Sequence, residues 1–327
     1  MVRETEDLKA ASDGVTVIVP AWNAAATLDA ALASVACQRR AADAVIVIDD
    51  ASFDSTREVA EAWSDRLPLT VVTLEKNSGP AVARDRGIRL ATTPLVALLD
   101  ADDVVLPEHL DLLLAARARS GAAIVSPNAR LWDPERGFGD GTYRDLVAPP
   151  APALQADEIL RRDFVCTGAL FERELYGRAG GFRAEFTGSE PWDLWIRMIN
   201  AGGFVTGVLD ATVLYRVAAM SMSRSDAAFR SAPALFESVC RDLAADPRRL
   251  AIAQATQLEM QARLDLYLAY EAAGNGDSSR ARKHARAARR GPKAVRARAT
   301  ALLCAPGFAR RQRDRAVQRR REHAVVR

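Results

Sequence analysis

Short apolar runs alternate with stretches of helical periodicity over residues 15–99. Four of these runs contain β-branched residues and read as strands buried in a parallel sheet. They cover residues 15–19, 44–48, 69–74 and 95–99. Between the first two runs, Leu28, Leu32 and Val35 recur at the spacing of an amphipathic helix. This alternation predicts an α/β fold in which helices cover both faces of a mostly parallel sheet.

Local signals predict where further helices begin. Ser55 and Glu58 have the spacing of a capping box, which would open the second helix. Pro80 has the place of a first helical residue in the third. Another helix is expected after Pro107, and we place His109 on its surface rather than in a ligand set.

Polar side chains follow three of the four strands, at the ends that a parallel sheet brings to one edge. The fourth strand runs into Asp100, Asp102 and Asp103, and open α/β sheets bind their ligands at this edge. Three neighbouring carboxylates repel one another, and a divalent cation would remove that cost. A solvated acidic turn is the alternative. Trp22, Asn23, Asp49 and Asp50, which follow the first two strands, are expected at the same edge as these three acids. Independent solvated turns need not share an edge, so this gathering of polar groups favours a ligand site.

The ligand that this edge suits best is a nucleoside diphosphate. The first strand is followed by no G-x-G-x-x-G motif, and the chain contains no P-loop. An aspartate accepts hydrogen bonds from a base or a ribose, and the Trp22 ring packs against a flat face. Magnesium or manganese bound by hard oxygen ligands would bridge the pyrophosphate.

Composition narrows the class of protein. The chain has 327 residues, of which 49% are hydrophobic and 27% charged, as in a soluble protein with one large domain and an appendage, or with two domains. No apolar run reaches the roughly 18 residues of a membrane span, and the acidic N-terminus predicts no signal peptide. Four widely spaced cysteines predict neither a metal motif nor disulfides, so we expect a reducing, cytoplasmic compartment.

Four ordered motifs resemble those of the family 2 glycosyltransferases with the GT-A fold. They occupy residues 17–23, 48–52, 79–87 and 98–103. The resemblance covers roughly residues 14–225 and implies inverting transfer of a sugar from a nucleotide sugar to an acceptor hydroxyl. The Gln-x-x-Arg-Trp motif of processive members does not occur, so non-processive transfer is expected.

The resemblance also implies roles for individual positions. Asp50 would contact the base of the donor, Asp100 the ribose, and Asp102 the divalent metal, Mn²⁺ or Mg²⁺. The nucleotide pocket would be lined by Pro20, Trp22 and Asn23. Arg84 would reach the donor phosphates, unless it forms a structural pair with Asp85.

Two positions depart from the family's pattern. Family members carry a Glu-Asp pair whose Asp is the presumed general base, and here Pro191 stands at that position. An inverting displacement needs a base within reach of the acceptor hydroxyl. We favour Glu190 for this role over Asp193, which would otherwise cap a helix from Leu194. Ala218 stands where a histidine near the metal is common.

The C-terminal part differs in pattern and charge. From about residue 233 the pattern is helical, and a helix stopped at 274–276 precedes an Ala- and Arg-rich helix over 278–290, a pair that resembles one tetratricopeptide-like hairpin. Residues 278–327 hold 17 basic and two acidic residues, a net charge of +15, against −12 for the rest. We expect four segments: a flexible N-terminus (1–13), the GT-A domain (14–232), a helical extension (233–309) and a basic tail (310–327).

The sequence of the basic tail is compatible with more than one kind of partner. It is either a solvated segment or a peripheral contact with anionic lipid, worth about 1 kcal/mol per basic residue. The second interpretation would bring the enzyme to glycan, lipid-linked or other hydroxyl acceptors. Nucleic acid is disfavoured, because the tail lacks interleaved aromatic residues. Two other functions stay open: a nucleotide-sugar-binding protein without turnover, and a nucleotidyltransferase, for which Ala24-Ala25-Ala26 offers no Gly-rich basic loop.

Overall fold

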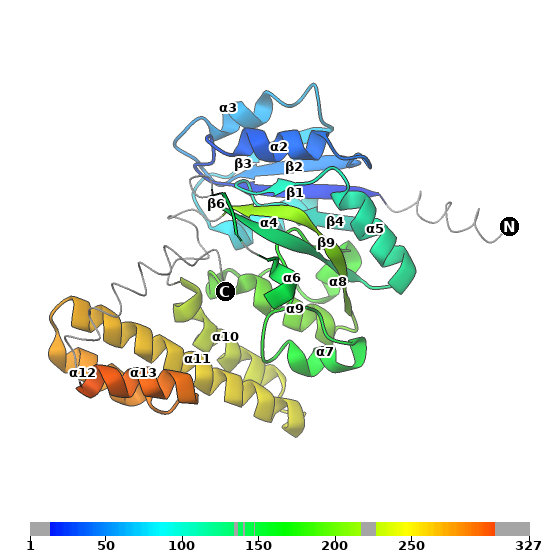
Figure 1. The fold of residues 1–327 in the computed structure, drawn as a ribbon. Coiled ribbons are helices and arrows are strands. Elements are labelled where there is room, and N and C mark those ends of the chain that lie inside the picture. The colour runs from blue at the N-terminus through cyan, green and yellow to red at the C-terminus, as the bar shows by residue number, and fades with distance from the viewer. Residues whose placement is uncertain (1–13, 134–136, 140, 147, 217–226, 305–327) are drawn as a thin grey trace. The chain divides into compact units, whose positions relative to one another are not determined.

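The structure is a computed structural model that describes residues 14–133, 137–139, 141–146, 148–216 and 227–304 (Figure 1). Within these residues the chain forms two compact units. The first comprises residues 14–184 and 190–216, and the second comprises residues 185–189 and 227–304.

Among the described residues, nine strands of the first unit form one mixed sheet. Its order is β3-β2-β1-β4-β8-β6-β9-β5, and β7 pairs with β6 outside this path. The strands are β1 (Val15–Ala21), β2 (Ala44–Asp49), β3 (Leu69–Thr73), β4 (Leu95–Leu98), β5 (Val104–Val105), β6 (Ile124–Asp133), β7 (Gly137–Phe138), β8 (Leu170–Glu172) and β9 (Val205–Arg216).

The four strands predicted from the sequence form the parallel half of this sheet. Helices cover both of its faces, as predicted: α2 (Leu28–Ala36) and α3 (Thr56–Glu61) on one, α4 (Pro80–Leu90) on the other (Figure 1). Alternate residues of β1 explain this, because Val17 faces the core cluster that includes α2, whereas Ile18 meets α4. A Cβ added at Gly87 of α4 would lie 2.6 Å from Ile18 Cγ2, so the glycine lets α4 approach the sheet closely.

The second half of the sheet is largely antiparallel and returns the chain to the acidic turn. β8 runs antiparallel to β4, with Val96 opposite Phe171, and β5 pairs with β9, with Val104 opposite Leu214. Because β5 directly follows the acidic turn, this pairing places the end of β9 beside it. The remaining helices of this part are α5 (His109–Ser120), α6 (Tyr143–Leu146), α7 (Pro152–Glu158), α8 (Arg173–Arg178), the 3₁₀ helix η1 (Ala184–Phe186) and α9 (Glu190–Asn200).

Two local predictions were wrong. The second helix starts where it was predicted, with Ser55 as the N-cap of α3, but the Ser55 side chain makes no capping hydrogen bond. Asp54 Oδ1 instead accepts from the Thr56 N–H at 3.1 Å. His109 is buried rather than on the surface, because the first turn of α5 packs against β9, where Thr212 Oγ1 lies 2.8 Å from His109 Nδ1. Burial lowers the pKa of His109 to about 4.

The second unit is helical. Its helices are α10 (Ala227–Asp242), α11 (Pro247–Gly274), α12 (Ser278–Ala288) and α13 (Lys293–Cys304). Asp246 caps α11 and Asp277 caps α12, each accepting a backbone N–H of the first turn. α11 and α12 correspond to the two helices of the predicted hairpin. α13 packs on them, because all three helices contribute to two small apolar clusters. No helix among the described residues has the length and apolarity that crossing a bilayer requires.

Candidate active site

A tight turn after β4 gathers the three acids that the sequence singled out. The Asp103 N–H donates to the Asp100 carbonyl at 3.0 Å, so the turn closes within four residues. Leu99 continues the pairing with β1 by donating to the Ile18 carbonyl. The turn therefore starts at the carboxyl edge of the parallel half of the sheet, where open α/β sheets bind ligands.

Asp100 is held from two sides. Arg84 Nη2, from the second turn of α4, donates to Asp100 Oδ1 at 2.6 Å, and Thr167 Oγ1 donates to Asp100 Oδ2 at 3.1 Å. Burial opposes the charge on Arg84, but the charges of Asp100 and Glu190 outweigh it and raise the pKa of Arg84. The sequence did not single out Thr167 as a partner of Asp100, because 67 positions separate them and only the pairing of β4 with β8 brings them together.

Arg84 also reaches the predicted general base. Its Nη1 lies 3.4 Å from Glu190 Oε1, and its guanidinium stands 5.9 Å from the centre of the Phe182 ring. Glu190 is 1% exposed, and its Oε2 is buried without a hydrogen-bond partner. One arginine thus joins Asp100 to Glu190 and leaves one oxygen of Glu190 unpaired.

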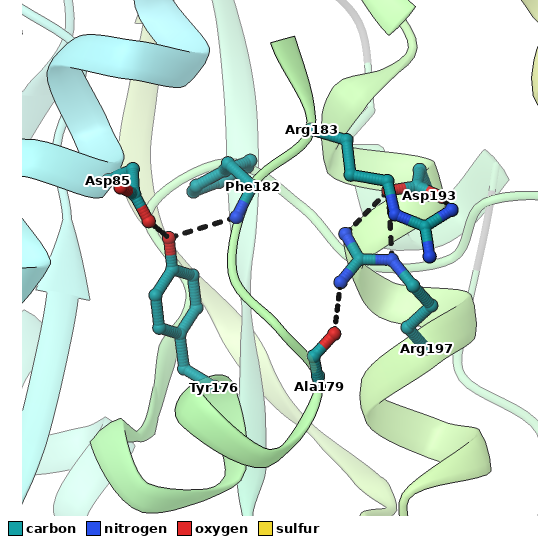
Figure 2. Close-up of polar contacts among 7 residues, drawn as sticks. All are labelled: Asp85, Tyr176, Ala179, Phe182, Arg183, Asp193 and Arg197. Atoms are coloured by element: carbon teal, nitrogen blue, oxygen red, sulfur yellow. Dashed lines mark hydrogen bonds and ion pairs between the residues drawn. The ribbon is translucent and has the colours of Figure 1, made fainter. Parts of the chain in front are cut away.

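Asp193, the alternative base, is engaged by two arginines (Figure 2). Its Oδ2 accepts from Arg197 Nε at 3.0 Å and from Arg197 Nη2, and its Oδ1 lies 3.7 Å from Arg183 Nη1. Arg197 also donates to the Ala179 carbonyl. α9 begins at Glu190, so the prediction that Asp193 caps a helix from Leu194 was wrong: Pro191 fits the first helical turn, where no intrahelical N–H bond is lost.

Asp85 has a structural role in the same region (Figure 2). Tyr176 Oη donates to Asp85 Oδ1 at 2.6 Å and accepts from the Phe182 N–H at 3.0 Å. Gly181 has a φ of +74°, and a Cβ there would lie 2.8 Å from Asp85 Oδ1. This contact fastens the segment that carries Phe182 to α4, beside Arg84.

Asp50 anchors the loop before α4. Its Oδ1 accepts the Ser78 N–H and its Oδ2 accepts the Gly79 N–H, both at 2.7 Å. Asp50 is buried, and its two bonds fix the entry to the helix that carries Arg84. Any contact with a donor base would use the remaining lone pairs of these oxygens.

The loops after β1 and β2 are joined through Asn23. Its Oδ1 accepts the Phe53 N–H and its own N–H donates to Ser52 Oγ, each at 2.9 Å, while its backbone takes a φ of +48°. Pro20 lies within β1, opposite Ile48. Trp22 is 51% exposed and Phe53 87% exposed, so two aromatic rings stand open at this edge. Sequence patterns did not single out Phe53, which follows the acidic motif of β2.

Arg216, at the end of β9, is the second cation at the acidic turn. Its Nε donates to the Asp102 carbonyl at 2.7 Å and its N–H donates to Asp103 Oδ1 at 2.8 Å. Asp103 Oδ2 is buried without a hydrogen-bond partner. Burial raises the pKa of both Asp102 and Asp103, and neighbouring carboxylates add to the effect. The turn therefore holds two carboxyl groups whose charged forms are disfavoured by burial and by neighbouring carboxylates.

The donor set fits a divalent cation that shares its coordination with a substrate. Asp102 and Asp103 offer hard carboxylate oxygens, one of them unpaired and buried. Within the described part of the chain, no group of three or more His, Cys, Asp and Glu side chains could hold an ion by itself. Magnesium is commonly bound by one or two carboxylates plus substrate phosphates. Ala218, where a histidine was looked for, lies outside the described residues.

The fold defines the class of protein as GT-A, and the comparisons with known proteins agree with this class. The model of the family described as "Glycosyl transferase family 2" matches residues 16–179, half of the chain. The chain belongs to this family, which confirms the resemblance drawn from the four motifs.

Solved structures share the fold. Staphylococcus aureus TarS 1–349 superimposes with a TM-score of 0.63 at 18% identity, covering 95% of this chain and 92% of that one. The mannosyltransferase PcManGT from Pyrobaculum calidifontis, in complex with GDP-Man and Mn²⁺, gives a TM-score of 0.58 at 23% identity, covering 92% and 82%. At these identities the likeness establishes the fold alone.

Curated relatives match over part of their length. The succinoglycan biosynthesis protein ExoU of Rhizobium meliloti (strain 1021) is 44% identical over 141 residues, 43% of this chain and 40% of its own. Validoxylamine A glucosyltransferase of Streptomyces hygroscopicus subsp. jinggangensis (strain 5008) is 39% identical over 203 residues, 53% of this chain and 48% of its own. The chain thus spans about half the length of these relatives.

Proposed function

We propose that the chain is an inverting, non-processive glycosyltransferase that moves a sugar from a nucleoside diphosphate sugar to an acceptor hydroxyl. The observation that carries the proposal is the bridge formed by Arg84, which joins Asp100 of the acidic turn to Glu190. This arrangement sets a donor-side acid beside a buried carboxylate with one oxygen free, as an inverting transfer requires. Relatives named glucosyltransferase, and TarS solved with UDP-GlcNAc, support a nucleotide-sugar donor.

The donor side is assigned to the edge formed by the ends of β1, β2 and β4. Asp102 would hold Mn²⁺ or Mg²⁺, which when bound offsets the charge of the departing diphosphate. Asp100 would accept from the ribose, and Asp50 from the base. The exposed Trp22 ring packs against the nucleotide, and Asn23 and Pro20 shape the loop that presents it. PcManGT, solved with GDP-Man and Mn²⁺, supports the choice of a divalent cation.

Glu190 is assigned as the general base. The acceptor hydroxyl attacks the anomeric carbon, the bond to the nucleoside diphosphate breaks, and the hydroxyl proton passes to Glu190 Oε2. Asp193 is less suited, because two arginines already engage its oxygens. Arg84 contacts the other oxygen, Glu190 Oε1, and so orients the carboxylate with Oε2 free.

The acceptor is proposed to be a glycan, a lipid-linked sugar or another hydroxyl compound of polysaccharide assembly. The names of ExoU and ExoO, succinoglycan biosynthesis proteins, support this class. The sugar transfer would take place at the cytoplasmic side of the cell envelope. The tail over 310–327, which lies outside the described residues, would contribute a peripheral contact with anionic lipid.

The test measures nucleotide release from a panel of nucleotide sugars, with Mn²⁺, with Mg²⁺ and with a chelator. We expect metal-dependent release from at least one donor, lost in Asp102→Ala. Tight donor binding without release would instead make the chain a nucleotide-sugar-binding protein. Pyrophosphate release from a nucleoside triphosphate would make it a nucleotidyltransferase.

A further inference from the structure

The helices α12 and α13 carry an unusual surface charge. From residue 278 to residue 304 the sequence holds nine lysines and arginines and no acid, and all nine are exposed. No ion pair joins any of the nine to another described residue. We call this surface the α12–α13 basic face.

The rest of the second unit shows the ordinary arrangement. Arg241 pairs with Glu237 on α10, Arg263 pairs with Glu259 on α11, and Arg230 of α10 pairs with Glu271 of α11. The same unit thus contains helix surfaces on which basic residues alternate with acids and pair with them. The α12–α13 basic face differs because it contains no acids.

The positions on α12 show that the charge is turned outward. Ala281, Ala285 and Ala288 are buried at helical spacing, and Ala285 and Ala288 join the clusters shared with α11 and α13. Lys283 and Arg286 lie on the opposite side of this helix, three residues apart, and the exposed Arg290 lies in the turn that follows the helix. Like charges at these spacings repel one another, so the face is costly in isolation and is relieved by a negative partner.

We infer that the α12–α13 basic face docks the protein on an anionic phospholipid membrane through charge alone. The contact is electrostatic because the larger apolar residues of these helices, Val295, Leu302 and Leu303, are used in packing within the unit. No helix of the described chain could insert across a bilayer. A membrane spreads its phosphates over a surface, which matches charges spread over two helices. The sequence continues the same charge after the described residues, with eight basic and two acidic residues between 305 and 327.

Nucleic acid fits the face less well. Single-stranded nucleic acids bind to grooves in which aromatic rings stack on bases. Residues 278–304 contain no phenylalanine, tyrosine or tryptophan. Charge without stacking rings favours the membrane. The inference rests on the charge of the face and not on the proposed transfer reaction, although docking would bring that site to lipid-linked acceptors.

The experiment is a vesicle co-sedimentation assay with the full chain, using vesicles of phosphatidylcholine alone and with 30 mol% phosphatidylglycerol added. We expect binding to the anionic vesicles only, and its loss as the salt concentration rises from about 0.1 M to 1 M, where the screening length falls from about 10 Å to about 3 Å. The test variant is Lys283→Gln/Arg286→Gln/Arg290→Gln. Each basic residue near an anionic surface contributes about fivefold to partitioning, so this variant should bind about 100-fold more weakly.

The matched control removes the same number of charges elsewhere. Arg57, Arg178 and Arg241 are exposed and paired with acids four residues away on other helices. Their triple change to glutamine should bind the anionic vesicles as the unchanged protein does. Circular dichroism and thermal unfolding check that both variants keep their helices, since glutamine is a good helix former.

Three results would overturn the inference. The first is equal binding to both kinds of vesicle, or to neither. The second is wild-type affinity in the test variant, which would put the contact outside this face. The third is binding to single-stranded DNA at the same salt that is tighter than binding to the anionic vesicles. Nucleotide release from a donor, measured without vesicles, tests the proposed transferase function separately. The membrane inference and the proposed function can therefore fail independently of each other.

Discussion

The Arg84 guanidinium lies 3.4 Å from the Glu190 carboxylate, across 106 positions of the chain. The same guanidinium holds Asp100 at 2.6 Å. The side chains of Arg84 and Glu190 are 12% and 2% exposed, so their charges are poorly screened and depend on each other. Asp100 and Glu190 share Arg84 as their ion-pair partner, and this dependence gives the first prediction.

Arg84→Met should be destabilising and inactive. Removing one partner of a buried ion pair leaves the other charge uncompensated, at a cost of about 3 kcal/mol. Urea unfolding measures this cost, and nucleotide release measures activity. Arg89→Met removes an exposed arginine of the same helix, paired with Asp85, and should change the unfolding free energy by about 1 kcal/mol or less. Equal effects of the two changes would refute the buried bridge.

Glu190→Gln should lower kcat by about 100-fold or more, the usual contribution of a general base, with donor affinity nearly unchanged. Gln keeps the shape of Glu190, but it cannot take a proton and carries no charge opposite Arg84. Steady-state transfer and donor titration measure the two effects. Asp193→Asn should act differently: it weakens the contacts with Arg197 and Arg183 and lowers stability. If Asp193→Asn lowers kcat without lowering stability, and Glu190→Gln does not lower kcat, the general base is Asp193 and not Glu190.

His109 should make stability depend on pH. Burial lowers its pKa in the folded protein to about 4, below the ordinary value near 6.5. The unfolded chain therefore binds the proton first, so the stabilising contribution is complete above pH 6.5 and is lost as the pH falls toward 4. The loss amounts to about 3 kcal/mol at most.

The measurement compares wild type with His109→Gln in urea at pH 7, 5.5 and 4. As the pH falls, the free energy of unfolding of wild type should decrease relative to that of His109→Gln. Burial raises the pKa of Asp163 to about 7, which favours the folded state at low pH and so opposes His109 over the same range. Asp163 is present in both proteins, so its effect cancels in the comparison. A pH-independent difference would mean that His109 titrates normally.

Gly87→Ala should destabilise the sheet–helix contact on which Arg84 depends. The new Cβ would lie 2.6 Å from Ile18 Cγ2, and overpacking of this kind costs about 1–3 kcal/mol. Gly177→Ala on α8 is the matched control, because a Cβ there meets nothing within 4 Å and should stabilise by up to about 1 kcal/mol. Ile18→Ala combined with Gly87→Ala should cost less than the sum of the single changes. Strict additivity would contradict the contact.

Local pattern determined the strands, the parallel core and the edge where polar groups gather. Continuous apolar runs and β-branched content are properties of short segments, and right-handed crossovers then leave few ways to arrange the strands. The parallel strand ends were therefore correctly placed at one edge, with Asp49 as the last residue of β2, Asp50 directly after it and Asp100 after β4. The family motifs lie in these same segments, and so they too could be read from the sequence.

Only the tertiary structure decided which acid meets which base. Asp193 pairs with Arg183 and Arg197, Glu190 keeps a free oxygen, and His109 is buried under β9. Charge and burial of these side chains depend on contacts between segments far apart in the chain, and no periodicity records them. The sequence by itself thus determined the sheet edge at which polar side chains gather. Contacts between residues more than a hundred positions apart, such as Arg84 and Glu190, decided how those side chains are paired.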